Sequence, residues 1–133
     1  MEFVQLYLVS FVSFIALDSV WLGVVAPKFY KANIGHLMAK NANFLAAGMF
    51  YVLFIAGLVF FVVQPAVHEA SWHVAITRGA FFGLVSYATF DLTSQAVLKD
   101  WPWLVTGVDL LWGTFVTAAV SGVSYLLFTR FVA

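Results

Sequence analysis

The stretch Tyr87–Trp103, with the sequence YATFDLTSQAVLKDWPW, decides how the rest of the chain is interpreted. It places the carboxylate of Asp91 inside an apolar segment, which then ends at Lys99 and Asp100. A Trp-Pro-Trp turn follows, and the next apolar segment contains a second carboxylate, Asp109. Because a carboxylate in membrane hydrocarbon costs roughly 2.5–3.5 kcal/mol, these aspartates indicate a functional site.

The composition indicates a membrane protein. The chain has 133 residues, of which 64% are hydrophobic and 9% are charged, whereas soluble domains are about 45–50% apolar and about 25% charged. A formal net charge of zero argues against binding to nucleic acid. The absence of cysteine excludes disulfides, thiolate catalysis and iron–sulfur clusters.

Four apolar segments are each long enough to cross a bilayer, which takes about 20 helical residues. Open sheets leave backbone groups unsatisfied in lipid, and the alternation of a β-barrel is absent, so the segments predict helices. The sequence therefore predicts an all-α, polytopic membrane protein whose single domain, residues 1–133, is a four-helix transmembrane bundle. The predicted spans are Phe3–Ala26, Phe44–Val63, Ala75–Leu98 and Leu104–Phe128.

The connection Pro27–Asn43 is the longest and most basic of the three. On a helix, Tyr30 and Ile34 share one side and Lys28 lies opposite, which predicts a short interfacial helix between the first two spans. An irregular basic loop is an equally good interpretation. The connection between the last two spans is a tight turn, in which Trp101 and Trp103 are expected to act as anchors at the membrane interface.

Basic residues predict the orientation of the chain, because cytoplasmic loops carry an excess of lysine and arginine. An orientation with both termini outside the cytoplasm collects four basic residues on the cytoplasmic side and leaves two outside. The cytoplasmic set is Lys28, Lys31, Lys40 and Lys99, and the outer set is Arg78 and Arg130.

Small residues recur at a spacing that lets helices approach closely. The third span contains Gly79-x-x-x-Gly83, and the fourth contains Thr117, Ala118, Ser121 and Gly122. Ordinary packing within the bundle is the favoured interpretation, and a specific contact between two copies of the chain is the alternative. A homo-oligomer therefore remains one of the expected partners.

Three aspartates are predicted to lie at similar depths. At a rise of 1.5 Å per residue, Asp18, Asp91 and Asp109 lie roughly 12, 10 and 8 Å from the same membrane boundary. Because no lysine or arginine is expected at that depth, at least one of these carboxyl groups should hold a proton near neutral pH. The three are therefore candidate proton-binding or acid–base residues. The alternative is that they only hydrogen-bond the helices together.

Helical phase adds candidate ligand-binding residues around the aspartates. Tyr87, Ser94 and Gln95 lie on the Asp91 side of their helix. Trp21 and Trp112 occur in a repeated Asp-x-x-Trp pattern and are expected to form a wall for a cation or a flat apolar ligand, with plain packing as the alternative. The second span, by contrast, is expected to be a packing helix without polar groups.

No metal or cofactor is expected. His68 and His73 lie close together in the sequence, and His36 lies in the basic connection, but no third ligand accompanies them. The chain also lacks a glycine-rich phosphate loop, a zinc-protease helix and a serine nucleophile elbow.

Three motifs resemble a bacterial integral-membrane family catalogued as domain of unknown function 2177 (DUF2177). They are Tyr87-x-x-x-Asp91-Leu92-Thr93, Leu98-Lys99-x-Trp101-Pro102 and Asp109-x-x-Trp112-Gly113-Thr114. The chain differs from the family pattern in Phe90, where tyrosine is common, and in Ser94, where asparagine is common. The resemblance implies a small multi-pass protein of the bacterial inner (cytoplasmic) membrane, and it implies no particular activity.

Two functions fit these observations best. The first is proton-coupled binding or transport of a small cationic or amphipathic ligand, with membrane lipid as the surrounding partner. The alternative is an intramembrane acid–base enzyme, of isomerase or cyclase type, that acts on a lipid or isoprenoid. A non-catalytic membrane subunit is a third possibility. An apolar cavity that opens towards lipid favours the enzyme, whereas a path to water on both faces favours transport.

Overall fold

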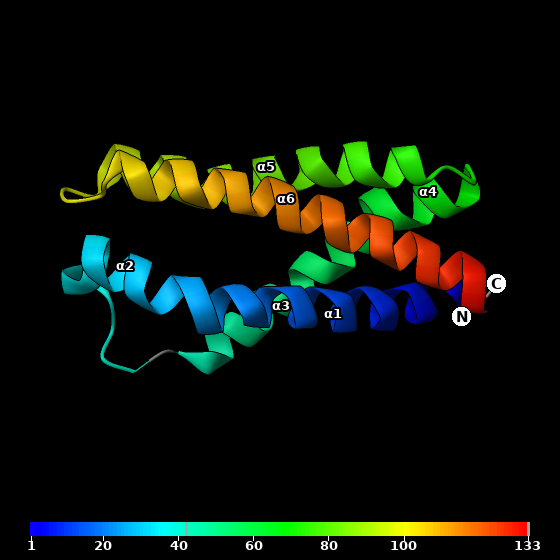
Figure 1. Cartoon of the computed structure of the whole chain (residues 1–133), viewed down its shortest axis with the longest axis horizontal. Helices are drawn as coiled ribbons and strands as arrows, with labels where there is room; N and C mark the ends of the chain where they lie inside the picture. The colour runs from blue at the N-terminus through cyan, green and yellow to red at the C-terminus, as the bar shows by residue number, and fades with distance from the viewer. Residues whose placement is uncertain (42, 133) are drawn as a thin grey trace.

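The computed structural model describes residues 1–41 and 43–132, and these residues form helices and no strands (Figure 1). The all-α prediction is therefore confirmed for this part of the chain. Helix α1 (Glu2–Val20) passes through a π-helical turn, η1 (Trp21–Val25), into α2 (Ala26–Ile34) and ends in a 3₁₀ turn, η2 (Gly35–Leu37). The helix predicted after the first span is present, but it continues that span rather than forming a separate element.

We call the continuous helix from Glu2 to Leu37 the α1–α2 rod. A second continuous helix, the α3–α4 rod, is built in the same way. Helix α3 (Phe44–Leu58) passes through a π-helical turn, η3 (Val59–Val63), into α4 (Gln64–His68). In both rods the π-helical turn ends two residues before a proline, Pro27 or Pro65. A proline inside a helix removes one backbone donor and its ring clashes with a carbonyl of the preceding turn. The wider π-helical turn relieves this clash, so both helices continue past the point where the sequence suggested that they end.

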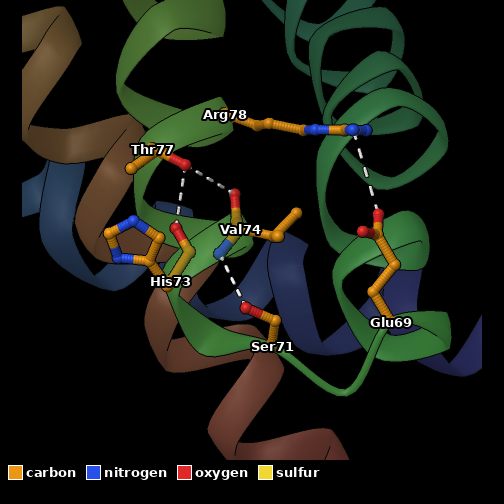
Figure 2. A network of polar contacts seen from close by, with 6 residues as sticks. All are labelled: Glu69, Ser71, His73, Val74, Thr77 and Arg78. Atoms are coloured by element: carbon orange, nitrogen blue, oxygen red, sulfur yellow. Dashed lines mark hydrogen bonds and ion pairs between the residues drawn. The ribbon is translucent and has the colours of Figure 1, made fainter.

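A short turn between α4 and α5 (Trp72–Val97) reverses the chain (Figure 2). Ala70 has a φ of 50°, and the amide of Ser71 donates to the carbonyl of Ala66 at 3.1 Å, which is the hydrogen bond of a Schellman motif. The Ser71 hydroxyl then caps α5 by accepting from the Val74 amide at 3.2 Å. Most of the segment between the second and third predicted spans, after Val63 and before Ala75, is thus helical.

Helices α5 and α6 (Trp103–Leu127) form an antiparallel hairpin and pack along most of their length (Figure 1). A Cβ atom added at Gly83 would lie 2.2 Å from the carbonyl oxygen of Gly113, and one at Gly79 would lie 2.5 Å from Ser121 Oγ. The small residues therefore serve packing within one chain, as the favoured interpretation proposed. A last π-helical turn, η4 (Phe128–Val132), extends α6.

The hydrophobic core lies between the α1–α2 rod, the α3–α4 rod and α6. Its buried side chains include Leu6, Phe14, Phe54, Ile55, Leu58, Val116 and Val120. Many large apolar side chains on the outer surface are exposed, for example Phe44, Phe81 and Leu111. A surface this apolar is typical of a protein that contacts lipid.

Three helices are long and apolar enough to span a membrane: Glu2–Leu37, Phe44–His68 and Trp103–Val132. The structure therefore supports three of the four predicted spans in the described part of the chain. Helix α5 has 26 residues and is long enough. It contains Arg78, Asp91 and several hydroxyl side chains, which lower its hydropathy below that of the other three.

We predict that Gly83→Ala destabilises the fold. The added methyl group meets the backbone of α6, which cannot move away without separating the hairpin, so the cost should be about 1–3 kcal/mol. Gly107→Ala is the matched control on α6, because a Cβ atom there meets nothing within 4 Å. Thermal unfolding in detergent measures both variants. Equal melting temperatures for Gly83→Ala and the native protein would contradict the close packing.

Candidate functional site

The three predicted aspartates lie in different helices and meet around one tyrosine. Asp18 in α1, Asp91 in α5 and Asp109 in α6 are 6%, 1% and 7% exposed. The Tyr87 side chain lies close enough to all three carboxyl groups to interact with their charges. Its ring lies against Gly113, where an added Cβ atom would be only 2.3 Å from the ring. The absence of a side chain at this position therefore makes room for the ring of Tyr87 beside α6.

Asp18 is held by two hydrogen-bond donors. The Tyr51 hydroxyl on α3 donates to one carboxylate oxygen at 2.8 Å, and the Trp112 indole N–H on α6 donates to the other at 3.4 Å. Asp18 thus joins three helices and has partners for both oxygens. This is the arrangement that the helix-bonding alternative predicts for an aspartate.

Asp109 on α6 is hydrogen-bonded to the α1–α2 rod, the same continuous helix that contains Asp18. The Tyr30 hydroxyl on α2 donates to its carboxylate. Between the two aspartates, the rings of Trp21 and Trp112 stack with centroids 4.6 Å apart and planes 11° from parallel. The repeated Asp-x-x-Trp pattern therefore corresponds to a contact between two antiparallel helices.

Asp91 differs from the other two. Neither of its carboxylate oxygens accepts a hydrogen bond from a donor group among the described residues, although the side chain is almost completely buried. Its charged neighbour is another acid, Asp109, and the two carboxyl groups lie close enough to share a proton in a hydrogen bond. No ion pair in the described part of the chain involves a member of the cluster. Buried polar groups in native proteins normally have a partner, so Asp91 requires a proton, a water molecule or a ligand.

A cavity of about 570 Å³ opens beside Asp91 and Asp109. This volume is typical of a small-molecule site. Most of its wall is apolar, and three wall residues, Met38, Phe50 and Phe90, are about half exposed. The complete lining is Tyr30, Ile34, Leu37, Met38, Phe50, Ser86, Tyr87, Phe90, Asp91, Trp101 and Asp109. The cavity therefore has two largely buried aspartates in its lining and an apolar wall that reaches the outside of the bundle.

Several predicted site residues lie outside this lining. Asp18, Trp21 and Trp112 lie behind it, in the contact between α1 and α6. Ser94 is buried one turn after Asp91. For these residues a role in ligand binding stays a prediction.

The amide of Gln95 is engaged within the protein. Its nitrogen donates to the carbonyl of Trp101 at 2.7 Å, and its oxygen accepts from the Thr106 hydroxyl at 2.8 Å. The Trp101 indole N–H also donates to Thr106 at 3.1 Å. These bonds turn Trp101 inward, where it is 8% exposed and packs against Ile34. The expectation that Trp101 anchors the membrane interface was therefore wrong, whereas Trp103 is 71% exposed.

The sequence interpretation missed two tyrosines. Tyr51 lies in the span that was expected to have no polar group, yet it donates to Asp18. Tyr30 was placed on the interfacial helix, yet it reaches Asp109 in the site. A tyrosine within an apolar helix is itself a signal, because a buried phenol hydroxyl usually finds a hydrogen-bond partner.

Comparison with known proteins gives one match. A family profile described as "Predicted membrane protein (DUF2177)" matches residues 3–126. No curated protein and no solved structure matches the chain. The match covers all three aspartates and all of the residues that line the cavity.

We predict that Tyr51→Phe lowers stability by about 1–3 kcal/mol, because it leaves one oxygen of the buried Asp18 carboxylate without its donor. Tyr125→Phe is the control, since its hydroxyl makes no hydrogen bond with the described residues. Thermal unfolding of the two variants in the same detergent is the measurement. If both lose the same stability, the Tyr51–Asp18 bond does not hold α3 to α1.

Proposed function

The chain belongs to the DUF2177 family of predicted membrane proteins, and on that premise we propose that it binds a cationic amphipathic molecule from the membrane. The observation that carries the proposal is Asp91, a buried carboxyl group without a partner on the wall of an apolar cavity. In the proposed complex, Asp91 and Asp109 bind the basic head group of the ligand. Its hydrocarbon part lies among the apolar side chains of the cavity.

The charge of the site supports a cation. Two neighbouring carboxyl groups repel an anion, and a neutral polar molecule leaves their shared negative charge uncompensated. Without a ligand, the pair avoids like-charge repulsion when one carboxyl group holds a proton. Binding of a cation then displaces that proton. Proton-coupled binding therefore follows from the same two groups, and transport is the extension in which the ligand leaves towards the other face.

The wall of the cavity supports an amphipathic ligand. The exposed apolar part of the lining is Leu37, Met38, Phe50 and Phe90, so a molecule with a hydrocarbon chain can enter from the lipid without first passing through water. A small inorganic cation gains nothing from these side chains. An alkylammonium compound satisfies both the acidic and the apolar parts of the site.

We predict that Asp91→Asn weakens the binding of dodecylammonium about tenfold or more, because the amide has the shape of the carboxyl group but no charge. Dodecylammonium labelled with bromine reports its own binding, because bromine quenches the fluorescence of Trp101, which lines the cavity. Asp100→Asn is the matched control, since Asp100 lies on the exposed turn. Dodecanol, which carries no charge, should bind the native protein weakly. It should bind the two variants with the same weak affinity. Equal binding of dodecylammonium to native protein and Asp91→Asn would contradict the proposal.

An acid–base enzyme acting on a lipid is the second candidate. The observation that favours it is the difference between the two cavity carboxyl groups. Asp109 accepts a hydrogen bond from Tyr30, whereas Asp91 has no partner. One carboxyl group that donates a proton and one that accepts a proton suffice for moving a double bond. A membrane lipid that changes in extracts of both a deletion strain and an Asp91→Asn strain would favour the enzyme over binding or transport.

We also propose that α5 is the fourth span and that both termini lie outside the cytoplasm. Helix α5 packs against α6 along most of its length, so the two helices cross the bilayer together. In Figure 1 both chain ends lie at one end of the bundle, opposite the turn that contains Lys99. An Arg78 side chain near one end of α5 can extend its charged group to the interface.

We predict opposite labelling of the two ends of α5. The chain has no cysteine, so Lys99→Cys and His73→Cys each introduce a single thiol at an exposed position. A membrane-impermeant maleimide applied to intact spheroplasts should label the thiol at position 73 but not the thiol at position 99. Lysis should make both reactive, which controls for local accessibility. Labelling of both thiols in intact cells would show that α5 does not cross the membrane.

A further inference from the structure

A second apolar groove lies near the other end of α5, on the surface between α5 and η3. It has a volume of about 530 Å³ and shares no residue with the cavity beside Asp91. Val62 is buried at its base, and Phe61 and Phe81 are 59% and 67% exposed. Its lining is Phe61, Val62, Thr77, Arg78, Phe81, Phe82 and Val85. The groove is thus almost entirely apolar and is walled by two exposed phenylalanines.

Arg78 is the only charged residue of this lining. Its guanidinium points towards the α4–α5 turn, where one nitrogen lies 3.8 Å from a carboxylate oxygen of Glu69 (Figure 2). Both side chains are 53% exposed, so this pair is weak. A guanidinium has five N–H donors arranged as a fork, and this single long contact leaves most of them available. The polar end of the groove therefore suits an anion with several oxygens.

We propose that this groove binds an anionic membrane phospholipid. One acyl chain lies between Phe61 and Phe81, and the phosphate accepts hydrogen bonds from Arg78. Charge complementarity identifies the occupant: an arginine at the end of an apolar groove matches a molecule that joins a phosphate to a hydrocarbon chain. The nearby polar group, the Thr77 hydroxyl, already donates to the carbonyl of His73 at 2.9 Å. Arg78 is thus the group that distinguishes one head group from another.

Glu69 opposes this binding, because its carboxylate competes with the phosphate for the guanidinium. Its removal should therefore strengthen binding of the lipid. The effect has the opposite sign to that expected for a pair that only stabilises the turn. This difference makes Glu69→Gln a second test, independent of whether an Arg78 variant folds.

The experiment uses the full-length protein in nanodiscs made of phosphatidylcholine with added phosphatidylglycerol. The protein is released from the nanodiscs, and native mass spectrometry then counts how many lipids of each kind it retains. We expect preferential retention of phosphatidylglycerol, a fall of about tenfold in that preference in Arg78→Gln, and an increase in Glu69→Gln. Arg130→Gln is the matched control, because Arg130 is exposed in η4 and does not line the groove. It should keep the native preference.

Four results of the lipid-retention measurement would overturn the proposal. They are equal retention of both lipids by the native protein, an unchanged preference in Arg78→Gln, a decrease in Glu69→Gln, and displacement of the lipid by inorganic phosphate alone. A dimer that forms through this groove, detected as a mass of two chains that Arg78→Gln abolishes, would identify a second copy as the occupant and would also overturn it. None of these results depends on the ligand of the cavity beside Asp91.

Discussion

The close approach of α5 to α6 is the constraint on which the rest of the structure depends. At Gly83 the two backbones are so near that no Cβ atom fits, and at Gly113 the ring of Tyr87 takes the place that a side chain would fill. Because the helices are antiparallel and locked at this distance, Asp91 and Asp109 become neighbours rather than lying on separate faces. A wider hairpin would separate the carboxyl groups and admit other side chains between them. The short distance between the two carboxyl groups therefore depends on glycines that have no reactive group themselves.

The α1–α2 rod then closes the site through aromatic contacts. The stack of Trp21 on Trp112 fixes the rod against α6, and Tyr30 reaches Asp109 from the continuation of the same rod past Pro27. Had the helix ended at Pro27, Tyr30 would lie on a loop and the cavity would lose one wall. The π-helical turn before the proline is thus a structural requirement of the site, since it lets a helix-breaking residue sit inside a helix that the site needs.

Much of the site follows from the sequence, and the parts that do not have physical reasons. Helical rise predicted that the aspartates lie close together, and the structure brings Asp91 and Asp109 together as neighbours. The depth of the three aspartates in the membrane stays a prediction. The partners of Gln95 do not follow from the sequence, because its hydrogen bonds run to a turn whose geometry a helical pattern does not describe. The predicted helix ends before Pro27 and Pro65 were also wrong, because both helices continue past the proline. The rule that proline ends a helix assumes an α-helical turn before the proline, whereas this chain has a π-helical turn there. The hydroxyl of Tyr51 was overlooked because tyrosine was counted among the hydrophobic residues.

Asp18 and Asp91 have different surroundings, and this difference supports a structural role for the first and our proposed binding role for the second. Asp18 receives two donors from two other helices, and a neutral acceptor of the same shape would serve that purpose almost as well. Asp91 receives no donor group from the described residues, shares its hydrogen bond with another acid, and belongs to the lining of a cavity. A charged acid in that position lowers the stability of the protein, because burial penalises its charge and no donor group of the described residues compensates. In our proposal, a proton shared with Asp109 compensates this cost in the absence of ligand, and a cationic ligand compensates it in the complex. The two aspartates therefore differ in their surroundings, and in our proposal the cavity takes its ligand preference from Asp91.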